Sequence, residues 1–367
     1  MKRLTAVSLF SGAGGMDVGM ESAGFQSLWA NEIDPKACET FRLNHPKTKL
    51  VEGDLRQHLD ELKKLNGVDL LHGGPPCQGF SVAGKMDPKD PRSELIWVYL
   101  EALRILQPRA FVCENVAALG LLTRWRAVRQ GLLQQFHSMG YESSFVVLNS
   151  SDYGVPQNRE RVFFIGLKDG SLPADLKIFS QKFRRKSPVV RSILLALGKP
   201  GSEKNQGICK AKITIAQSPV LRKSPYAGML FNGLGRPLRL DGYSSTMHAS
   251  MGGNKTPFVD EEALYNGKKP WVEDYHSKLW AGGKPIAIDE APPFLRRITV
   301  SEAKAIQSFP SDYVFHGSQS SQFCQIGNAV PCGLAEAVGR LVFELLEPSE
   351  LEGSASADEE RSFCLVA

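Results

Sequence analysis

The segment LFSGAGGMDVGM, residues 9–20, joins an apolar strand to the start of a helix through a glycine-rich loop. Glycine allows a ligand to approach the backbone closely, and the first amides of the helix can then face that ligand. An acidic residue, Glu32, follows 20 residues after Gly12, at the end of the next expected strand. In doubly wound α/β folds, an acid at that position accepts hydrogen bonds from a ribose diol. The segment therefore predicts a nucleoside-cofactor site on an α/β sheet.

Apolar strand segments alternate with helical segments from residue 4 to about residue 167. Such alternation predicts an α/β fold with a doubly wound, mostly parallel, Rossmann-like sheet. The expected strands are 5–10, 26–34, 49–55, 68–74, 109–116 and 161–167. The expected helices between them are 16–24, 35–45, 94–106 and 126–140.

The glycine loop departs from the fingerprint of dinucleotide-binding proteins. The third glycine position after Gly12 and Gly14 is Asp17, whose carboxylate we expect to face the place of a pyrophosphate. That arrangement disfavours NAD and is compatible with a nucleoside that carries a sulfonium. Asp54, at the end of the third strand, could accept a hydrogen bond from an adenine amino group. Glu32 and Asp54 could instead be ordinary solvated acids at strand ends.

Composition indicates an ordinary globular protein. Among 367 residues, 42% are hydrophobic and 23% are charged, and the net charge of +5 permits an anionic partner without requiring one. The seven cysteines lack the close spacing of a zinc site, and we expect no metal. Early glycines argue against a signal peptide, and no apolar run is long enough for a membrane span. We expect a reduced, soluble, cytoplasmic protein with no membrane association.

The rhythm of strands and helices is interrupted between about residues 170 and 295. This stretch is rich in lysine, arginine, glycine, proline and serine, and it reads as a basic insertion or as a set of solvated surface loops. A turn and a long apolar helix return from residue 322 onward. We expect a catalytic domain at 1–175 plus 320–347, an inserted domain with a hinge at 176–319, and a disordered acidic tail at 348–367.

Polar residues that can carry chemistry follow two expected strands. Cys77 ends VDLLHGGPPC and Glu114 ends RAFVCE, both at carboxyl ends where open α/β sheets bind ligands. Cysteine is a strong nucleophile, and a buried glutamate can act as a general acid. Arg159 and Arg161 lie two residues apart, so on one side of a strand they could bind an anion or a carbonyl. The alternatives without a function are that Cys77 is a small buried apolar residue and that Arg159 and Arg161 are solvated at the start of a strand.

The chain resembles the DNA (cytosine-5)-methyltransferases of bacterial restriction-modification systems. The motifs that carry the resemblance occur in the family's order: FSGAGG, NEID, PPCQGFS, ENV, QNRER, RRITVSEAKAIQSFP and GNAVP. They cover roughly residues 5–167 and 296–345. The basic insertion falls where this family has its target-recognition domain.

The resemblance implies roles for individual residues. Cys77 would attack carbon 6 of cytosine, Glu114 would hold and protonate ring nitrogen 3, Arg161 would contact the base carbonyl, and Arg159 would support this geometry. Pro76 would fix the loop that bears the thiol. S-adenosylmethionine would be bound by Phe10, Ser11, Gly12, Gly14, Gly15, Glu32, Ile33, Asp54, Leu55, Pro76 and Asn328. DNA would be contacted by Gln78, Ser81 and Thr246.

The implied activity is that of a DNA (cytosine-5-)-methyltransferase, EC 2.1.1.37, acting on a base flipped out of double-stranded DNA. We expect a monomer that associates with the nucleoid when bound to DNA. Three alternatives stay open. A transfer-RNA methyltransferase of the same family would carry a cysteine-phenylalanine-threonine signature in the insertion, which is absent here. A catalytically inactive family member would be expected to lose Cys77 or Glu114, and an NAD-dependent oxidoreductase would need a pyrophosphate beside Asp17.

Overall fold

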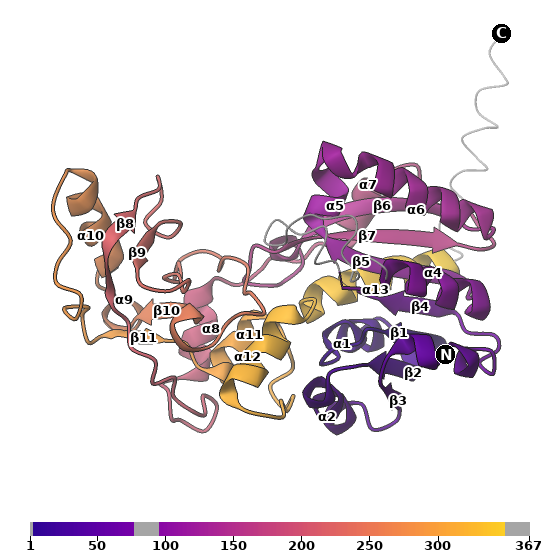
Figure 1. Ribbon diagram of the computed structural model, residues 1–367, viewed down its shortest axis with the longest axis horizontal. Coiled ribbons are helices and arrows are strands. Elements are labelled where there is room, and N and C mark those ends of the chain that lie inside the picture. Colours follow the sequence, from indigo (N-terminus) through magenta and orange to yellow (C-terminus); the bar gives the residue numbers. More distant parts are fainter. Residues whose placement is uncertain (1–2, 77–94, 349–367) are drawn as a thin grey trace, which may run out of the picture.

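The computed structural model describes residues 3–76 and 95–348 and has two lobes (Figure 1). The larger lobe contains a seven-stranded sheet in the order β3-β2-β1-β4-β5-β7-β6. Its strands are β1 (Leu4–Leu9), β2 (Phe25–Glu32), β3 (Lys49–Glu52), β4 (Leu70–Gly73), β5 (Ala110–Val116), β6 (Glu142–Asn149) and β7 (Glu160–Leu167). The first five strands along the chain pair in parallel, which confirms the doubly wound α/β fold.

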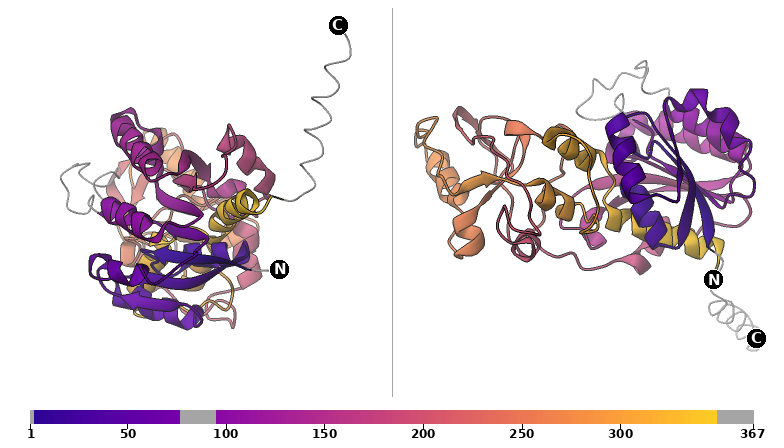
Figure 2. Two further views of the ribbon diagram at one scale, coloured as in Figure 1. Left: turned by 90° about the vertical axis from the view of Figure 1, so that its right-hand side faces the viewer. Right: turned by 90° about the horizontal axis from the view of Figure 1, so that it is seen from below.

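Helices cover both faces of this sheet (Figure 2). They are α1 (Gly15–Ser22), α2 (Pro35–Asn44), α3 (Leu59–Leu62), α4 (Leu95–Leu106), α5 (Ala117–Leu121), α6 (Arg126–Ser138), α7 (Leu176–Ser180) and α13 (Cys332–Leu346). Successive strand residues point to opposite faces. On β1, Leu4 and Ala6 accordingly join a core with α1 and α13, whereas Val7 and Leu9 join a second core with α4 and α6.

The strand β6 is absent from the sequence-based expectation. It pairs antiparallel with β7, and β7 pairs antiparallel with β5, so a hairpin closes this edge of the sheet. Much of β6 is only partly buried, because it is an edge strand. Its segment ESSFVVLN nevertheless contains FVVL, residues 145–148, a run of residues that favour strands and that the expected list of strands left out.

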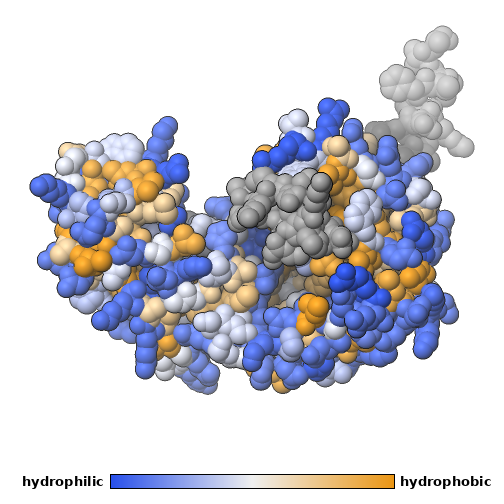
Figure 3. Space-filling view, viewed as in Figure 1, coloured by the Kyte–Doolittle hydropathy of each residue, from blue (hydrophilic) through white to orange (hydrophobic). Residues whose placement is uncertain are grey.

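The smaller lobe has little regular structure and lies at the left of Figure 1. Its elements are α8 (Val190–Leu197), β8 (Ile215–Val220), β9 (Met229–Phe231), β10 (Phe258–Asp260), α9 (Glu261–Tyr265), α10 (Trp271–Trp280), β11 (Leu295–Arg297), α11 (Val300–Ile306) and α12 (Gln319–Asn328). The far part has its own apolar core around Phe231, Phe258 and Tyr275. Between the two lobes the molecular surface is hollowed (Figure 3).

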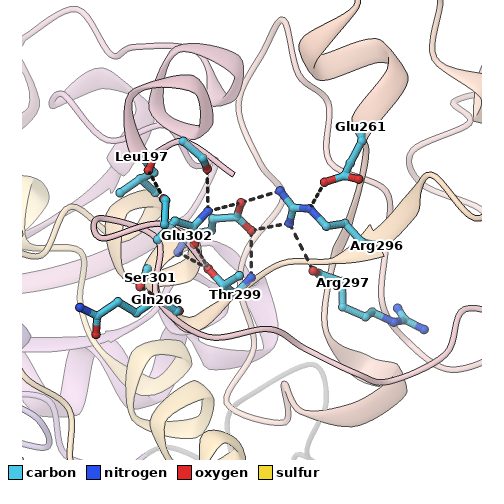
Figure 4. A network of polar contacts seen from close by, with 11 residues as sticks. Leu197, Gln206, Glu261, Arg296, Arg297, Thr299, Ser301 and Glu302 are labelled. Atoms are coloured by element: carbon cyan, nitrogen blue, oxygen red, sulfur yellow. Dashed lines mark hydrogen bonds and ion pairs between the residues drawn. The ribbon is translucent and has the colours of Figure 1, made fainter. Parts of the chain in front are cut away.

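A buried polar network fixes the start of α11 in the smaller lobe (Figure 4). Thr299 caps the helix, and the fully buried Glu302 completes a capping box with it. Arg296 donates two hydrogen bonds to the Glu302 carboxylate, at 2.8 and 2.7 Å. Asn205 Nδ2 donates to the same carboxylate at 3.0 Å, which ties the segment after α8 to α11. A buried carboxylate must have its oxygens hydrogen-bonded or ion-paired. The bonds to Glu302 therefore stabilise the start of α11 and the segments that contact it.

Within the described residues, no helix has both the length and the apolar character needed to cross a bilayer.

Candidate active site

A cavity of about 570 Å³ opens where the order of the parallel strands reverses, between β1 and β4. Open α/β sheets bind ligands at this position, beyond the carboxyl ends of the strands. The walls come from parts of the chain that are far apart in sequence: 8–13, 15–16, 31–34, 37, 53–56, 73–76, 95, 114–116, 159, 161, 246–249, 324–325 and 327–330. The cavity is therefore built jointly by the sheet, the insertion and the segment before α13.

The predicted cofactor residues converge on this cavity, with one exception. Its lining includes Phe10, Ser11, Gly12, Gly15, Glu32, Ile33, Asp54, Leu55, Pro76 and Asn328. Gly14 is not among the lining residues. It caps α1 in the left-handed region, with a φ of 80°, and a side chain there would lie 2.5 Å from His45 Nε2. Gly14 thus faces the side of the loop that is turned away from the cavity.

Glu32 ties the glycine loop to the end of β2. One carboxylate oxygen accepts from the Gly12 amide at 2.7 Å, and the other accepts from the amides of Ile33 and Asp34 at 2.9 and 2.8 Å. Burial raises the pKa of Glu32 and outweighs these backbone hydrogen bonds, which lower it. The neighbouring Ile33 side chain is 63% exposed, so it presents an apolar surface at the cavity.

Asp54 lies at the other side of the cavity. Its side chain caps a short 3₁₀ turn, Leu55–Gln57, and pairs with Arg56. Hydrogen bonds from Arg56 lower the pKa of Asp54, which therefore stays ionised as an acceptor.

Glu114 and Arg161 form an ion pair on the cavity wall, with 2.8 Å between Arg161 Nε and Glu114 Oε1. Antiparallel pairing sets Arg161 opposite Val116, two residues beyond Glu114. Burial raises the pKa of Glu114, although Arg161 and Arg159 oppose the shift. Gly74 makes room for the carboxylate, because a Cβ there would lie 2.7 Å from Glu114 Oε2. The site thus holds a buried acid, with a pKa that burial raises, next to the guanidinium of Arg161.

Arg159 has a different environment from Arg161. It precedes β7, is 2% exposed, and donates to the carbonyls of Met247 at 2.8 Å and Gly327 at 3.0 Å. Arg159 and Arg161 both line the cavity, as expected for two arginines on one side of the strand, but their partners differ. Arg161 pairs with Glu114, while Arg159 joins the sheet to two other segments.

Gln157 reinforces this junction. Its Oε1 accepts from the Met247 amide at 2.9 Å, and its Nε2 donates to Gln307 at 2.8 Å. Both glutamine side chains belong to fully buried residues. Gln157 lies in the motif QNRER and Gln307 in the motif RRITVSEAKAIQSFP, but nothing in the sequence indicates that their two side chains meet.

Thr246 lines the cavity together with Glu114 and Arg161. Its hydroxyl donates to the Asn158 carbonyl at 2.9 Å, which holds the insertion against the start of β7. His248 and Cys324 also line the cavity, and the sequence analysis named neither. His248 lies within the segment TMHAS, residues 246–250, and Cys324 lies three residues before the motif GNAVP. These positions are the signal in the sequence that could have identified them.

Cys77, Gln78 and Ser81 lie outside the described residues, so their predicted roles stay predictions. In the sequence Cys77 directly follows Pro76, which lines the cavity.

The expected position of Asp17 is wrong. Its carboxylate is fully buried and accepts hydrogen bonds from Ser8 Oγ at 3.0 Å and Ser27 Oγ at 3.3 Å. It points from α1 toward the sheet instead of into the cavity, because the turn of the helix carries it to the inner face. Asp17 therefore gives no argument against a dinucleotide.

Fold and site together define a doubly wound α/β enzyme, with a ligand cavity at the strand carboxyl ends and a buried acid–arginine pair in its wall. The chain belongs to the C-5 cytosine-specific DNA methylase family, whose model matches residues 4–344. Its enzyme class is accordingly DNA (cytosine-5-)-methyltransferase.

Curated relatives agree with this assignment. The chain is 33% identical to the Type II methyltransferase M1.HphI of Haemophilus parahaemolyticus, over 93% of this chain and 87% of that protein. It is 32% identical to the Type II methyltransferase M.NgoPII of Neisseria gonorrhoeae, over 93% of this chain and 96% of that protein.

Solved structures agree on the fold. A Spodoptera frugiperda DNMT2 mutant matches with a TM-score of 0.63 and 18% identity, over 93% of this chain and 100% of that one. The S. pombe Dnmt2 methyltransferase matches with the same TM-score and identity, over 95% of this chain and 99% of that one.

The junction at Arg159 generates a stability prediction. Arg159→Lys should lower the free energy of unfolding by about 1–3 kcal/mol, because an ammonium cannot satisfy both buried carbonyls with the geometry of the guanidinium fork. Urea unfolding measures the change. Arg126→Lys, at an exposed residue of α6, is the control and should leave the midpoint unchanged. Equal midpoints for the two variants would contradict the structural role of Arg159.

Proposed function

We propose that the protein transfers a methyl group from S-adenosylmethionine to carbon 5 of a cytosine flipped out of a specific double-stranded DNA sequence. The observation that carries this proposal is the Glu114–Arg161 pair, which shares one cavity with the glycine loop and Glu32. The cavity therefore offers polar groups for the edge of a flipped base close to a site for a nucleoside cofactor. The names of the Type II relatives support a role as the modification enzyme of a restriction-modification system.

The residues of the cavity fit a nucleoside that carries a sulfonium. The Glu32 carboxylate, already anchored by three backbone amides, would accept from ribose hydroxyls. Ile33 and Leu55 would provide apolar contacts, and Asp54 would accept from the adenine amino group. Backbone groups of the glycine loop and Asn328 would line the rest. When bound, S-adenosylmethionine would supply the methyl group as an electrophilic sulfonium.

Glu114 and Arg161 would act on the flipped cytosine. Burial raises the pKa of Glu114, which is the direction that a general acid donating to ring nitrogen 3 requires. The Arg161 guanidinium would donate to the base carbonyl oxygen. Together they would draw electron density from the ring and make carbon 6 more electrophilic. Arg159 would act indirectly, by holding Met247 and the end of α12 against the sheet.

Cys77 would be the nucleophile. Its thiolate would add to carbon 6 and form a C–S bond, which turns carbon 5 into an enamine carbon able to attack the methyl group. A base would then remove the proton from carbon 5, the C–S bond would break, and the thiolate would leave. None of these steps can occur within a stacked duplex, so the base must be extruded first.

The smaller lobe would provide DNA recognition, within the expected domain 176–319. Leu176, Phe179 and Phe183 pack against the core of the large sheet, so the proposed recognition unit begins after them. Exposed lysines such as Lys204, Lys223 and Lys255 would contact phosphates, whereas a few polar side chains would read base edges. Thr246, at the cavity wall, would lie close to the extruded base.

The first prediction of this proposal concerns the cofactor. Glu32→Gln should weaken S-adenosylmethionine binding roughly 10- to 100-fold, because a charged acceptor contributes about 1.5–3 kcal/mol. Isothermal titration calorimetry measures the dissociation constant. Glu52→Gln is the matched control: Glu52 lies opposite Glu32 on β3, pairs with Arg42 and is not part of the cavity lining. Binding of NAD in place of S-adenosylmethionine would overturn the cofactor assignment.

The second prediction concerns turnover. Cys77→Ser should fold and bind DNA and cofactor but transfer almost no methyl groups, because a serine hydroxyl is far less ionised than a thiol. Glu114→Gln should slow transfer about 10²- to 10⁴-fold by removing the general acid. Bisulfite sequencing of DNA from expressing cells, with incorporation of radioactive methyl groups in vitro, measures both effects. Cys209→Ser, in the smaller lobe, should keep full activity; full activity of Cys77→Ser would refute the proposal.

A further inference from the structure

Two polar side chains lie against the glycine loop on the side opposite the cavity. The Tyr313 hydroxyl donates a hydrogen bond to the carbonyl of Ala13, which itself lines the cavity. His45 Nε2 lies beside Gly14, where the approach is so close that only glycine fits. Tyr313 belongs to the segment between α11 and α12, and His45 directly follows α2. Two distant parts of the chain thus meet behind the cofactor loop.

These side chains continue into a chain of polar contacts. His45 Nε2 lies 3.1 Å from the Tyr313 hydroxyl, and His45 Nδ1 lies 3.1 Å from Glu21 Oε1 on α1. The His45 side chain is 2% exposed and packs on the Phe41 ring, with 4.4 Å between the ring centroids. Water has little access to the imidazole, so its protons must go to these two partners.

A count of protons determines the charge of His45. The single hydroxyl proton of Tyr313 is donated to Ala13, so Tyr313 can only accept from His45, and Nε2 must carry a hydrogen. The oxygen of Glu21 that faces Nδ1 accepts in the hydrogen bond that raises the pKa of His45, so Nδ1 carries a hydrogen as well. Both nitrogens are then protonated, and His45 is an imidazolium ion.

The surroundings of His45 agree with this charge. It faces Glu21 and Asp17 on α1, Tyr313, and His72 on β4. Burial alone lowers the pKa of His45, but the hydrogen bond to Glu21 and the charges of Asp17 and Glu21 outweigh it, and the pKa is raised. Burial lowers the pKa of His72, so that ring stays neutral and adds no repulsion.

We propose that Glu21, His45 and Tyr313 form a charged relay that positions the Ala13 carbonyl, and with it the glycine loop, for the cofactor. They are positioning residues, because none of them lines the cavity. The inference rests on the proposed function, since it concerns the S-adenosylmethionine site.

Loss of the His45 proton disables the relay. The neutral ring would keep Nδ1–H toward the Glu21 charge, so Nε2 would become an acceptor. It would then compete with the Ala13 carbonyl for the only hydroxyl proton of Tyr313. The protonated ring is present below the pKa of His45 and is lost as the pH rises through it. Cofactor affinity should therefore fall as the pH rises through this pKa.

Calorimetric titration of the full chain with S-adenosylmethionine from pH 6 to pH 9 tests the relay. Wild-type affinity should decrease with rising pH. Tyr313→Phe should bind about 2- to 12-fold more weakly at low pH, the equivalent of one lost hydrogen bond, and should show a flattened pH profile. Tyr141→Phe is the matched control, because this buried tyrosine also donates to a backbone carbonyl, that of Pro108, on another part of the sheet. Its affinity and profile should equal those of the wild type.

Glu21→Gln separates the relay from a merely structural role. Glutamine can still accept from Nδ1, so affinity at low pH should stay near that of the wild type. The fall in affinity should move to lower pH, because the charge that retains the His45 proton is gone. A wild-type profile without pH dependence, or wild-type binding by Tyr313→Phe, would overturn the relay alone. A wild-type protein that binds no S-adenosylmethionine at any pH would overturn the proposed function, and the relay with it.

Discussion

The buried guanidinium of Arg159 joins the three parts of the chain that make the active site. Its hydrogen bonds to Met247 and Gly327 hold the insertion and the end of α12 against the start of β7. Two residues further along, Arg161 reaches the cavity and Glu114. Because the two arginines lie two residues apart on one short segment, the hydrogen bonds that join the lobes also fix the position of the Glu114–Arg161 pair. The hydrogen bonds of Arg159 to two backbone carbonyls therefore hold the walls of the cavity together, and Arg159 is itself one of the lining residues.

Three acidic residues of the large lobe have different hydrogen-bonding partners and therefore different roles. Asp17 is enclosed by serine hydroxyls inside the fold, Glu32 is anchored by backbone amides at the cavity, and Glu114 is paired with an arginine. Carboxylates out of water need such partners, and the partners determine what each can do. Burial raises the pKa of both Glu32 and Glu114, so their partners distinguish them: three backbone amides hold Glu32 at the glycine loop, whereas Glu114 faces an arginine side chain in the cavity wall.

Much of the fold could be predicted from the sequence, because apolar strands alternate with helices and the polar residues follow strand ends. That logic placed Glu32, Asp54 and Glu114 at one edge, where they line a common cavity. It missed β6, although FVVL at residues 145–148 is a run of residues that favour strands. It misplaced Asp17, since the orientation of a helical side chain depends on packing against the sheet. Gln157 and the Glu21–His45–Tyr313 contacts join residues far apart in the chain, and no local pattern reveals them. Cys77 stays a prediction.

We propose that methyl transfer proceeds through a covalent bond between Cys77 and carbon 6 of cytosine. An oligonucleotide that carries 5-fluorocytosine at the methylated position tests it most directly, because fluorine cannot leave as a cation and the adduct cannot be resolved. With S-adenosylmethionine present, mass spectrometry of the digested complex should find the methylated fluorinated base attached to the peptide that contains residue 77. An enzyme that methylates the unmodified oligonucleotide but forms no adduct, or an adduct at another residue, would contradict the account.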